Sequence, residues 1–233
     1  MYLDPMYFVI LAPGLLLSLW ASFRTKSAFN KYSRVRVASG ATGAQAAQRL
    51  LAQAGIHDVE IVPTHGMLSD HYNPATKKLA LSEAVYATNS IAAVGVACHE
   101  AGHAIQHAQH YKPLWLRSAL VPTAKIGSTL GYIVMAIGVM MQSIQGQTVV
   151  LVGALLFSGV LLFQIVTLPV EFDASARAKR LTVEHGIVLQ QERAGMDRVL
   201  NAAAMTYVAA AVSTLMTLLY FLLRSGLLGG GRR

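Results

Sequence analysis

The longest uncharged segments of this 233-residue chain are the feature that most constrains what it can fold into. They cover residues 5–23, 126–170 and 199–223, and are 19, 45 and 25 residues long. A membrane-spanning helix needs about 20 predominantly apolar residues. The middle segment is long enough for two spans, and its polar stretch at 142–147 (QSIQGQ) predicts a short turn between them. We therefore expect four transmembrane helices, arranged as an uncleaved N-terminal anchor, a helical hairpin and a last span.

The composition agrees with a membrane protein. Charged residues make up 13% of the chain, whereas a soluble domain carries about 25%. The net charge of +8 comes from basic residues beside apolar runs, so we expect contact with anionic lipid and no nucleic-acid partner. The single cysteine, Cys98, excludes an internal disulfide framework and a cysteine-based structural zinc site.

Lysine and arginine predict how the chain is oriented in the bilayer, because cytoplasmic loops carry an excess of both. Residues 24–125 hold 11 of them and residues 171–198 hold five, against three near the C-terminus. We expect both segments to face the cytoplasm. The expected parts are an anchor at 5–23, a cytoplasmic region at 24–125, a hairpin at 126–170, a cytoplasmic helical region at 171–198, a last span at 199–223 and a tail at 224–233.

The cytoplasmic segments predict a small α+β element. Residues 42–56 have helical periodicity, residues 59–63 have strand character, and residues 71–81 are typical of a β-hairpin. Asn89 and Ser90 are suitable N-cap residues for a helix that begins at Ile91 and ends before Pro113.

Within that helix lies the motif His99–Glu100–Ala101–Gly102–His103, an H-E-x-x-H pattern. Four residues along a helix correspond to about 400° of rotation, so both imidazoles lie on one face and can share a zinc ion. Glu100 is rotated by about 100° from His99 and can take a proton from a water molecule at the metal. The motif predicts one catalytic zinc ion, with Glu100 as the general base.

A third ligand is needed, and the sequence offers Glu171, Glu184 and Glu192. The extended motif with a third histidine is excluded, because Gln occupies both 106 and 109. Glu171 fits best, since the hairpin returns the chain to the cytoplasmic face at that position. A stripe of small residues then follows at positions 174, 175 and 178, which would allow close approach to the motif helix.

The combination of an N-terminal anchor, HEAGHAIQH and PVEFDAS resembles the YugP-like family of bacterial membrane zinc metallopeptidases over nearly the whole chain. It is similar, more distantly, to HtpX and the CAAX-prenyl endopeptidases. The resemblance implies that His99, His103 and Glu171 are zinc ligands and that Glu100 is the general base. The wider group has Asp four residues after the ligand Glu, where this chain has Ser175. Asp173 lies two residues after it, so the resemblance leaves open which residue orients His99 or His103.

Several other residues have weaker signals. His107 lies one turn beyond His103 with His110 close behind, and we expect a structural role for it, because a fourth ligand would close a catalytic site. Cys98 is expected to be a packed thiol. The residues that stand as candidates to stabilise an oxyanion are His185, Arg177 and Tyr207.

Together these patterns predict a mainly α integral membrane protein with a small zincin-like α+β element. The expected activity is hydrolysis of membrane-proximal or misfolded polypeptides by a zinc metalloendopeptidase of the H-E-x-x-H plus Glu type. The expected partners are a polypeptide substrate and the lipid bilayer, and the oligomeric state is left open. The alternative is a non-catalytic membrane adaptor in which zinc only joins two helices, although such a site does not need Glu100. A transporter is disfavoured, because the expected spans contain essentially no charge.

Overall fold

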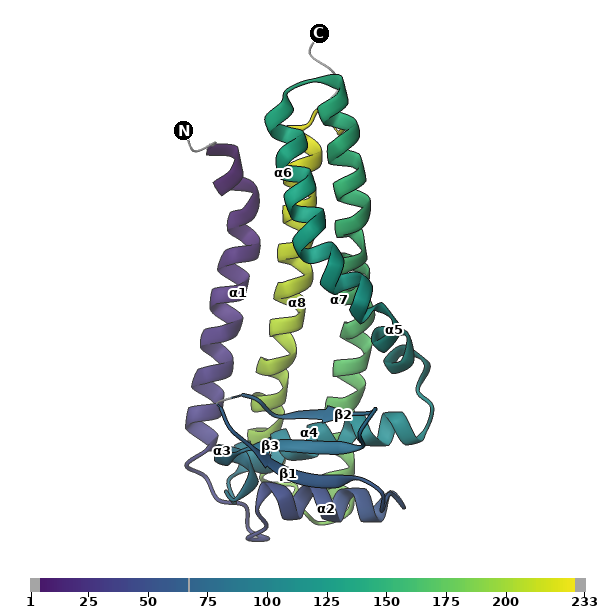
Figure 1. Cartoon of the computed structure of the whole chain (residues 1–233). Helices are drawn as coiled ribbons and strands as arrows, with labels where there is room; N and C mark the ends of the chain where they lie inside the picture. The colour runs from purple at the N-terminus through teal and green to yellow at the C-terminus, as the bar shows by residue number, and fades with distance from the viewer. Residues whose placement is uncertain (1–4, 67, 229–233) are drawn as a thin grey trace. The chain divides into compact units, whose positions relative to one another are not determined.

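A computed structural model of the protein describes residues 5–66 and 68–228 (Figure 1). The chain is mainly α-helical, with a small three-stranded sheet. The elements are α1 (Pro5–Tyr32), α2 (Gly43–Gln53), β1 (Glu60–Thr64), β2 (His71–Asn73), β3 (Lys78–Ser82), α3 (Glu83–Tyr86), α4 (Ile91–Ala108), α5 (Lys112–Ile126), the π-helix η1 (Gly127–Gly131), α6 (Tyr132–Met141), α7 (Ile144–Glu184) and α8 (Arg193–Arg224).

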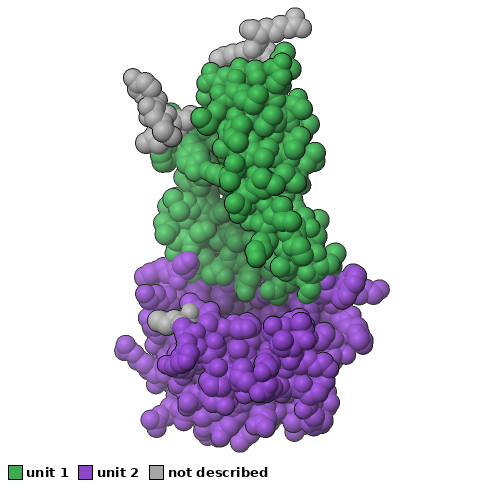
Figure 2. All heavy atoms as spheres, in the orientation of Figure 1, with its two compact units in different colours: residues 1–21, 116–168, 206–233 green, residues 22–115, 169–205 purple. Residues whose placement is uncertain are grey.

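The chain divides into two compact units (Figure 2). Unit 1 comprises residues 1–21, 116–168 and 206–233, and unit 2 comprises residues 22–115 and 169–205. Helices α1, α5, α7 and α8 each contribute residues to both units.

Four helical stretches among the described residues are long and apolar enough to cross a membrane: Pro5–Tyr32, Lys112–Met141, Ile144–Glu184 and Arg193–Arg224. This confirms the expected number of candidate spans. The predicted turn is also present, because α6 ends at Met141 and Gln142 adopts a left-handed backbone conformation, with φ of 47°. The expected boundaries of the membrane and cytoplasmic segments stay a prediction.

Inside unit 1, α6 and α7 pack closely through glycines. A Cβ at Gly153 would lie 2.6 Å from the backbone nitrogen of Met135, and one at Gly138 would lie 2.6 Å from that of Val150. Small residues permit such close approach of helices in a membrane. A cluster of buried apolar side chains in this unit includes Met135 of α6, Val150 of α7 and Phe221 of α8.

The sheet of unit 2 has the strand order β1-β3-β2. Strands β2 and β3 form the expected antiparallel hairpin, in which Tyr72 pairs with Leu79. Strand β1 pairs in parallel with β3, with Glu60 opposite Lys78. The sequence did not predict this parallel pairing, because it joins β1 to the second strand of the hairpin and β2 lies between them in the sequence. The inner positions of β3, Leu79 and Leu81, are fully buried.

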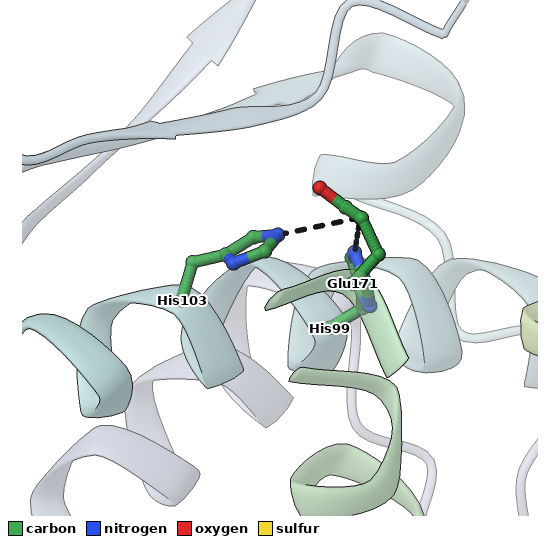
Figure 3. A group of neighbouring side chains, drawn as sticks. All are labelled: His99, His103 and Glu171. Carbon is green, nitrogen blue, oxygen red and sulfur yellow. Dashed lines mark ion pairs between the residues drawn. The ribbon is translucent and has the colours of Figure 1, made fainter. Parts of the chain in front are cut away.

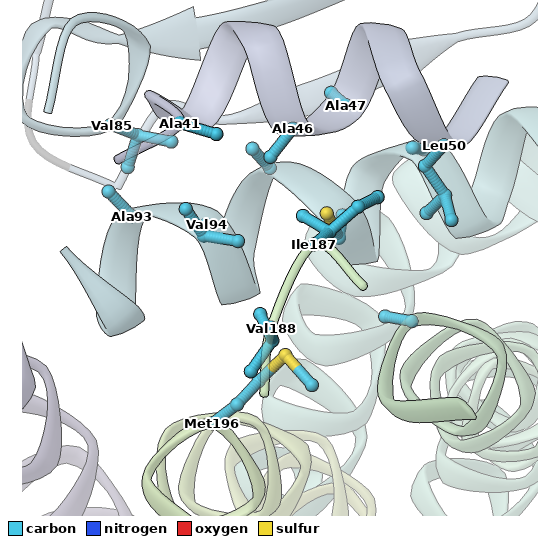
Figure 4. Close-up of a cluster of buried hydrophobic side chains, with 14 of the residues drawn as sticks. Ala41, Ala46, Ala47, Leu50, Val85, Ala93, Val94, Ile187, Val188 and Met196 are labelled. Carbon is cyan, nitrogen blue, oxygen red and sulfur yellow. The ribbon is translucent and has the colours of Figure 1, made fainter. Parts of the chain in front are cut away.

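Helices α2 and α4 form the main core of unit 2 (Figure 4). Thr42 caps α2 in a reciprocal arrangement with Gln45, which satisfies two free backbone N–H groups. Ala46, Ala47 and Leu50 of α2 are buried in the same cluster as Val94 of α4. Small side chains on both helices permit a short distance between their backbones, so α4 is held firmly in the centre of the unit.

Helix α7 differs from expectation near Pro169. The sequence predicted a hairpin that ends at residue 170 and a separate helical region from residue 171, whereas α7 runs unbroken from Ile144 to Glu184. A proline inside a helix removes one backbone hydrogen bond and favours a kink, but it does not have to end a long helix. Glu171 therefore lies in the interior of α7 rather than in the first turn of a separate helix.

Candidate metal centre

Helix α4 presents the two motif histidines from one face. It begins at Ile91, as predicted, and the Ser90 side chain accepts a hydrogen bond from the Ala93 backbone N–H at 3.1 Å. His99 and His103 are one turn apart on this helix, and their ring centroids are 4.8 Å apart with the rings nearly perpendicular. The helix geometry therefore brings two imidazoles to the same point.

Helix α7 brings Glu171 to that point (Figure 3). The Oε2 atom of Glu171 lies 3.2 Å from Nε2 of His99 and 3.6 Å from Nε2 of His103. One potential ligand atom from each of these three residues lies within 4.8 Å of the others. Residues that are about 70 positions apart in the sequence thus form a single group in unit 2.

The donor set fits a zinc ion. Two imidazole nitrogens and one carboxylate oxygen are the ligands of many catalytic zinc sites, which keep a fourth position open. Ligands that lie about 2.0–2.1 Å from a tetrahedral zinc ion lie about 3.4 Å from one another. The two separations from Glu171 to the histidines, 3.2 and 3.6 Å, bracket this value, and the two imidazole nitrogens lie within 4.8 Å of each other.

The electrostatics of the site also favour a cation. Burial alone lowers the pKa of His103, but the contact with Glu171 and the negative charges of Glu100 and Glu171 together raise it above its usual value. The same carboxylates that stabilise a protonated imidazole stabilise a bound divalent metal ion. Because Glu171 is 2% exposed and His103 is 7% exposed, water screens these charges weakly.

The second nitrogen of each imidazole contacts another side chain. Nδ1 of His99 lies 3.1 Å from Oγ of Ser175, and Nδ1 of His103 lies 2.9 Å from Oε1 of Gln106. Such partners orient the ring and present Nε2 to a metal. The sequence left the partner open between Ser175 and Asp173. The structure gives Ser175 to His99 and adds Gln106, which the sequence did not single out, although it lies three residues after His103.

A close approach of α4 and α7 makes this arrangement possible. A Cβ atom at Gly102 would lie 2.7 Å from the carbonyl oxygen of Ala174, so only glycine fits there without a shift. Ala174 and Ala178 are fully buried and Ser175 is nearly so. These are the small residues that predicted the close approach.

Glu100 lies on α4 between the two histidines and is 9% exposed. Its negative charge acts on His103. Within the described part of the chain, no hydrogen bond or ion pair is found for its carboxylate. A buried carboxylate beside the group, and not engaged by the protein there, is suited to accept a proton.

The other candidate ligands contact residues elsewhere. Glu184 is exposed and pairs with Arg180 at 3.4 Å. Glu192 accepts backbone hydrogen bonds from Ala38 at 2.7 Å and Leu189 at 2.8 Å. Both carboxylates therefore have structural partners away from His99 and His103.

The residues with weaker signals separate into different surroundings. His107 contacts the hydroxyl of Tyr72 on β2 through Nδ1 at 2.9 Å, and His110 is exposed beyond the end of α4. Cys98 is fully buried, which raises the pKa of its thiol.

The three oxyanion candidates belong to different parts of the chain. Arg177 pairs with Asp173 of α7 in unit 2. His185 follows the end of α7, also in unit 2. Tyr207 belongs to the part of α8 in unit 1.

Comparisons with known proteins place the chain in a family. Residues 7–226 match the model of a family described as "Putative neutral zinc metallopeptidase". The chain is 43% identical over 219 residues to a protein of Bacillus subtilis (strain 168) named "Putative membrane protease YugP", and the match covers 94% of this chain and 96% of that protein. No solved structure matches the chain. With its match over nearly the full length, the chain belongs to this family of neutral zinc metallopeptidases.

Proposed function

We propose that this protein is a zinc endopeptidase in which His99, His103 and Glu171 bind one zinc ion and Glu100 is the general base. The observation that carries the proposal is the convergence of three potential ligand atoms within 4.8 Å, from two helices of unit 2. The family match and the 43% identical membrane protease support hydrolysis of peptide bonds as the reaction.

Each group has a separate task in this mechanism. A bound zinc ion supplies a Lewis acid that polarises the scissile carbonyl and lowers the pKa of water. Glu100 accepts the proton of the attacking water and later delivers it to the leaving amine nitrogen. Ser175 and Gln106 hold the two imidazoles through their Nδ1 atoms, so that Nε2 of each ring points toward Glu171.

The substrate we propose is a membrane-proximal or misfolded polypeptide that reaches the site from the cytoplasmic side of a bacterial inner membrane. The distribution of lysine and arginine supports this orientation. Strand β2 is at the edge of the sheet, and its Tyr72 contacts His107 of α4. An extended peptide can add to such an edge by β-augmentation.

The test compares wild type with Glu100→Gln in purified, detergent-solubilised protein. Elemental analysis measures bound zinc, and cleavage of casein measures activity. We expect Glu100→Gln to retain one zinc ion per chain and to lose about 10²–10⁴-fold in cleavage rate, because proton transfer is removed while the ligands stay.

The matched control is Glu184→Gln, which makes the same change in an exposed residue and should leave both readings at the wild-type level. Cleavage by Glu100→Gln at the wild-type rate would contradict the role of Glu100. Bound zinc without cleavage in wild type would favour the adaptor, and absence of zinc from protein purified with added metal would exclude the site.

A further inference from the structure

Gln106 is a fully buried polar side chain that the zinc-binding motif does not require. It lies on α4, three residues after His103. We propose that Gln106 is a positioning residue: it fixes the orientation of His103 and also holds the segment of α7 that carries Glu171. This inference rests on the proposed zinc site and names a residue that the site depends on.

The contacts of the amide determine which way it points. Nε2 of Gln106 donates to the carbonyl oxygen of Val170 at 2.8 Å and to Oδ2 of Asp173 at 2.7 Å. Both partners are acceptors only, so both N–H groups of the amide are used. If the amide were flipped, its oxygen would face two other oxygens at these distances. The orientation with Oε1 toward His103 is therefore the one that satisfies every atom.

The orientation of the amide in turn determines the state of His103. Oε1 of Gln106 can only accept, so Nδ1 of His103 must carry a hydrogen and donate it over 2.9 Å. In the neutral imidazole, Nε2 then carries the lone pair, and it is Nε2 that faces Glu171. Gln106 thus selects the tautomer that can bind a metal ion through the nitrogen nearest the other two ligands.

Asp173 is itself held in place. Nε of Arg177, one turn along α7, donates to the same Oδ2 atom that accepts from Gln106. A charged acceptor strengthens a hydrogen bond, and a partner of opposite charge orients the carboxylate. The order of contacts is therefore Arg177, Asp173, Gln106 and His103, and it leads from α7 to α4.

The two bonds from Gln106 to α7 flank the third ligand. Val170 directly precedes Glu171, and Asp173 follows it by two residues. The buried side chain of Gln106 on α4 thereby orients His103 and fixes the backbone position of Glu171. Loss of a residue that hydrogen-bonds to a metal ligand, without binding the metal itself, typically costs about 10–100-fold in metal affinity.

The test measures zinc affinity of the full-length protein in detergent by competition with a chelator of known affinity. Gln106→Met keeps the length of the side chain but removes its three hydrogen bonds. We expect Gln106→Met to bind zinc about 10–100-fold more weakly than wild type. Gln48→Met makes the same change at an exposed position of α2 and should bind zinc as wild type does.

A second variant and a second readout separate orientation from packing. Asp173→Ala removes the acceptor that Gln106 shares with Arg177 and leaves Gln106 in place, so we expect about tenfold weaker zinc binding. ¹⁵N NMR of the zinc-free protein reports which ring nitrogen of His103 carries the hydrogen, and we expect Nδ1–H in wild type but a mixture of tautomers in Gln106→Met. Circular dichroism reports whether each variant is folded, and Asp173→Ala decides the matter if Gln106→Met does not fold.

Two results would overturn the inference. One is wild-type zinc affinity in Gln106→Met, and the other is wild-type zinc affinity in Asp173→Ala. Both can occur while wild type binds zinc and cleaves casein, so they are distinct from a failure of the proposed function, in which wild type itself lacks zinc or activity.

Discussion

Among the described residues, exposed large apolar side chains outnumber buried ones in unit 1, whereas buried ones outnumber exposed ones in unit 2. Phe8, Leu16 and Leu155 of unit 1 are each more than half exposed, and Leu50, Leu79 and Leu81 of unit 2 are at most 1% exposed. The buried polar side chains also gather in unit 2. Among the described residues, Thr167 is the one buried polar side chain of unit 1. Those of unit 2 are Ser82, Ser90, Glu100, His103, Gln106, Glu171, Ser175 and Thr182.

This difference shows where the chain can tolerate change. An exposed apolar side chain of a spanning helix meets lipid, and another apolar residue of different shape serves there as well. A buried polar side chain has specific partners, and loss of one partner leaves the other without its hydrogen bond. We therefore expect zinc binding to depend on single residues of unit 2 and to be insensitive to matched changes in unit 1.

The largest effect is expected for Glu171→Ala. The change removes one proposed ligand and leaves both imidazoles without their negative neighbour, so zinc affinity should fall by more than the roughly 100-fold that can follow loss of a residue that only orients a ligand. Elemental analysis after purification should find little zinc, and casein should not be cleaved. Glu184→Ala is the matched control, because an exposed ion pair contributes little. Full zinc content in Glu171→Ala would move the third ligand to another residue.

The features predicted from the sequence are those that depend on local patterns. Uncharged runs gave the number of candidate spans, because a helix in lipid must be apolar over about 20 residues. The spacing of His99 and His103 placed both imidazoles on one face, and the small residues after Glu171 predicted the close approach of α7 to α4.

Other features depend on tertiary contacts that no local pattern contains. The parallel pairing of β1 with β3 and the continuation of α7 through Pro169 are two examples. The contact of Gln106 with His103 is a third. A glutamine three residues after a ligand histidine has no distinctive signal, because its role follows from the carbonyl of Val170 and the carboxylate of Asp173 on another helix.

A smaller effect is expected from a pair of glycine substitutions that separates the two units. Gly102→Ala in unit 2 and Gly153→Ala in unit 1 each place a Cβ less than 3 Å from backbone atoms of a neighbouring helix. Overpacking of this kind costs about 1–3 kcal/mol of stability. We expect both to lower the thermal unfolding midpoint, but only Gly102→Ala should weaken zinc binding, because it moves α4 away from Ala174. Equal zinc affinities in the two variants would contradict the expected difference between unit 1 and unit 2.

A still smaller effect is expected for Ser175→Ala, which removes the contact of Ser175 with Nδ1 of His99. His99 is partly exposed, so water can replace the hydroxyl, and zinc affinity should fall by about tenfold, the low end for such partners. Ser158→Ala is the control in unit 1, since its hydroxyl bonds only to the carbonyl of Leu155 three residues before it. Chelator competition measures both. A loss as large as that of Glu171→Ala would show that Ser175 does more than orient the ring.

The smallest effect is expected at the surface of unit 2, where Lys77 donates a hydrogen bond to Asp58. This bond is the main reason why the pKa of Asp58 lies below its usual value of 3.8. A carboxyl group whose pKa is lowered in the folded state stabilises the fold above its unfolded pKa, and this contribution is lost as the pH falls through the folded value. The unfolding midpoint of wild type should therefore exceed that of Asp58→Asn slightly at pH 7, and the difference should shrink as the pH falls below 3.8 and vanish below the folded pKa of Asp58. Because both side chains are exposed, salt should reduce the difference as well. A difference that persists at low pH and high salt would show that Asp58 acts through packing rather than charge.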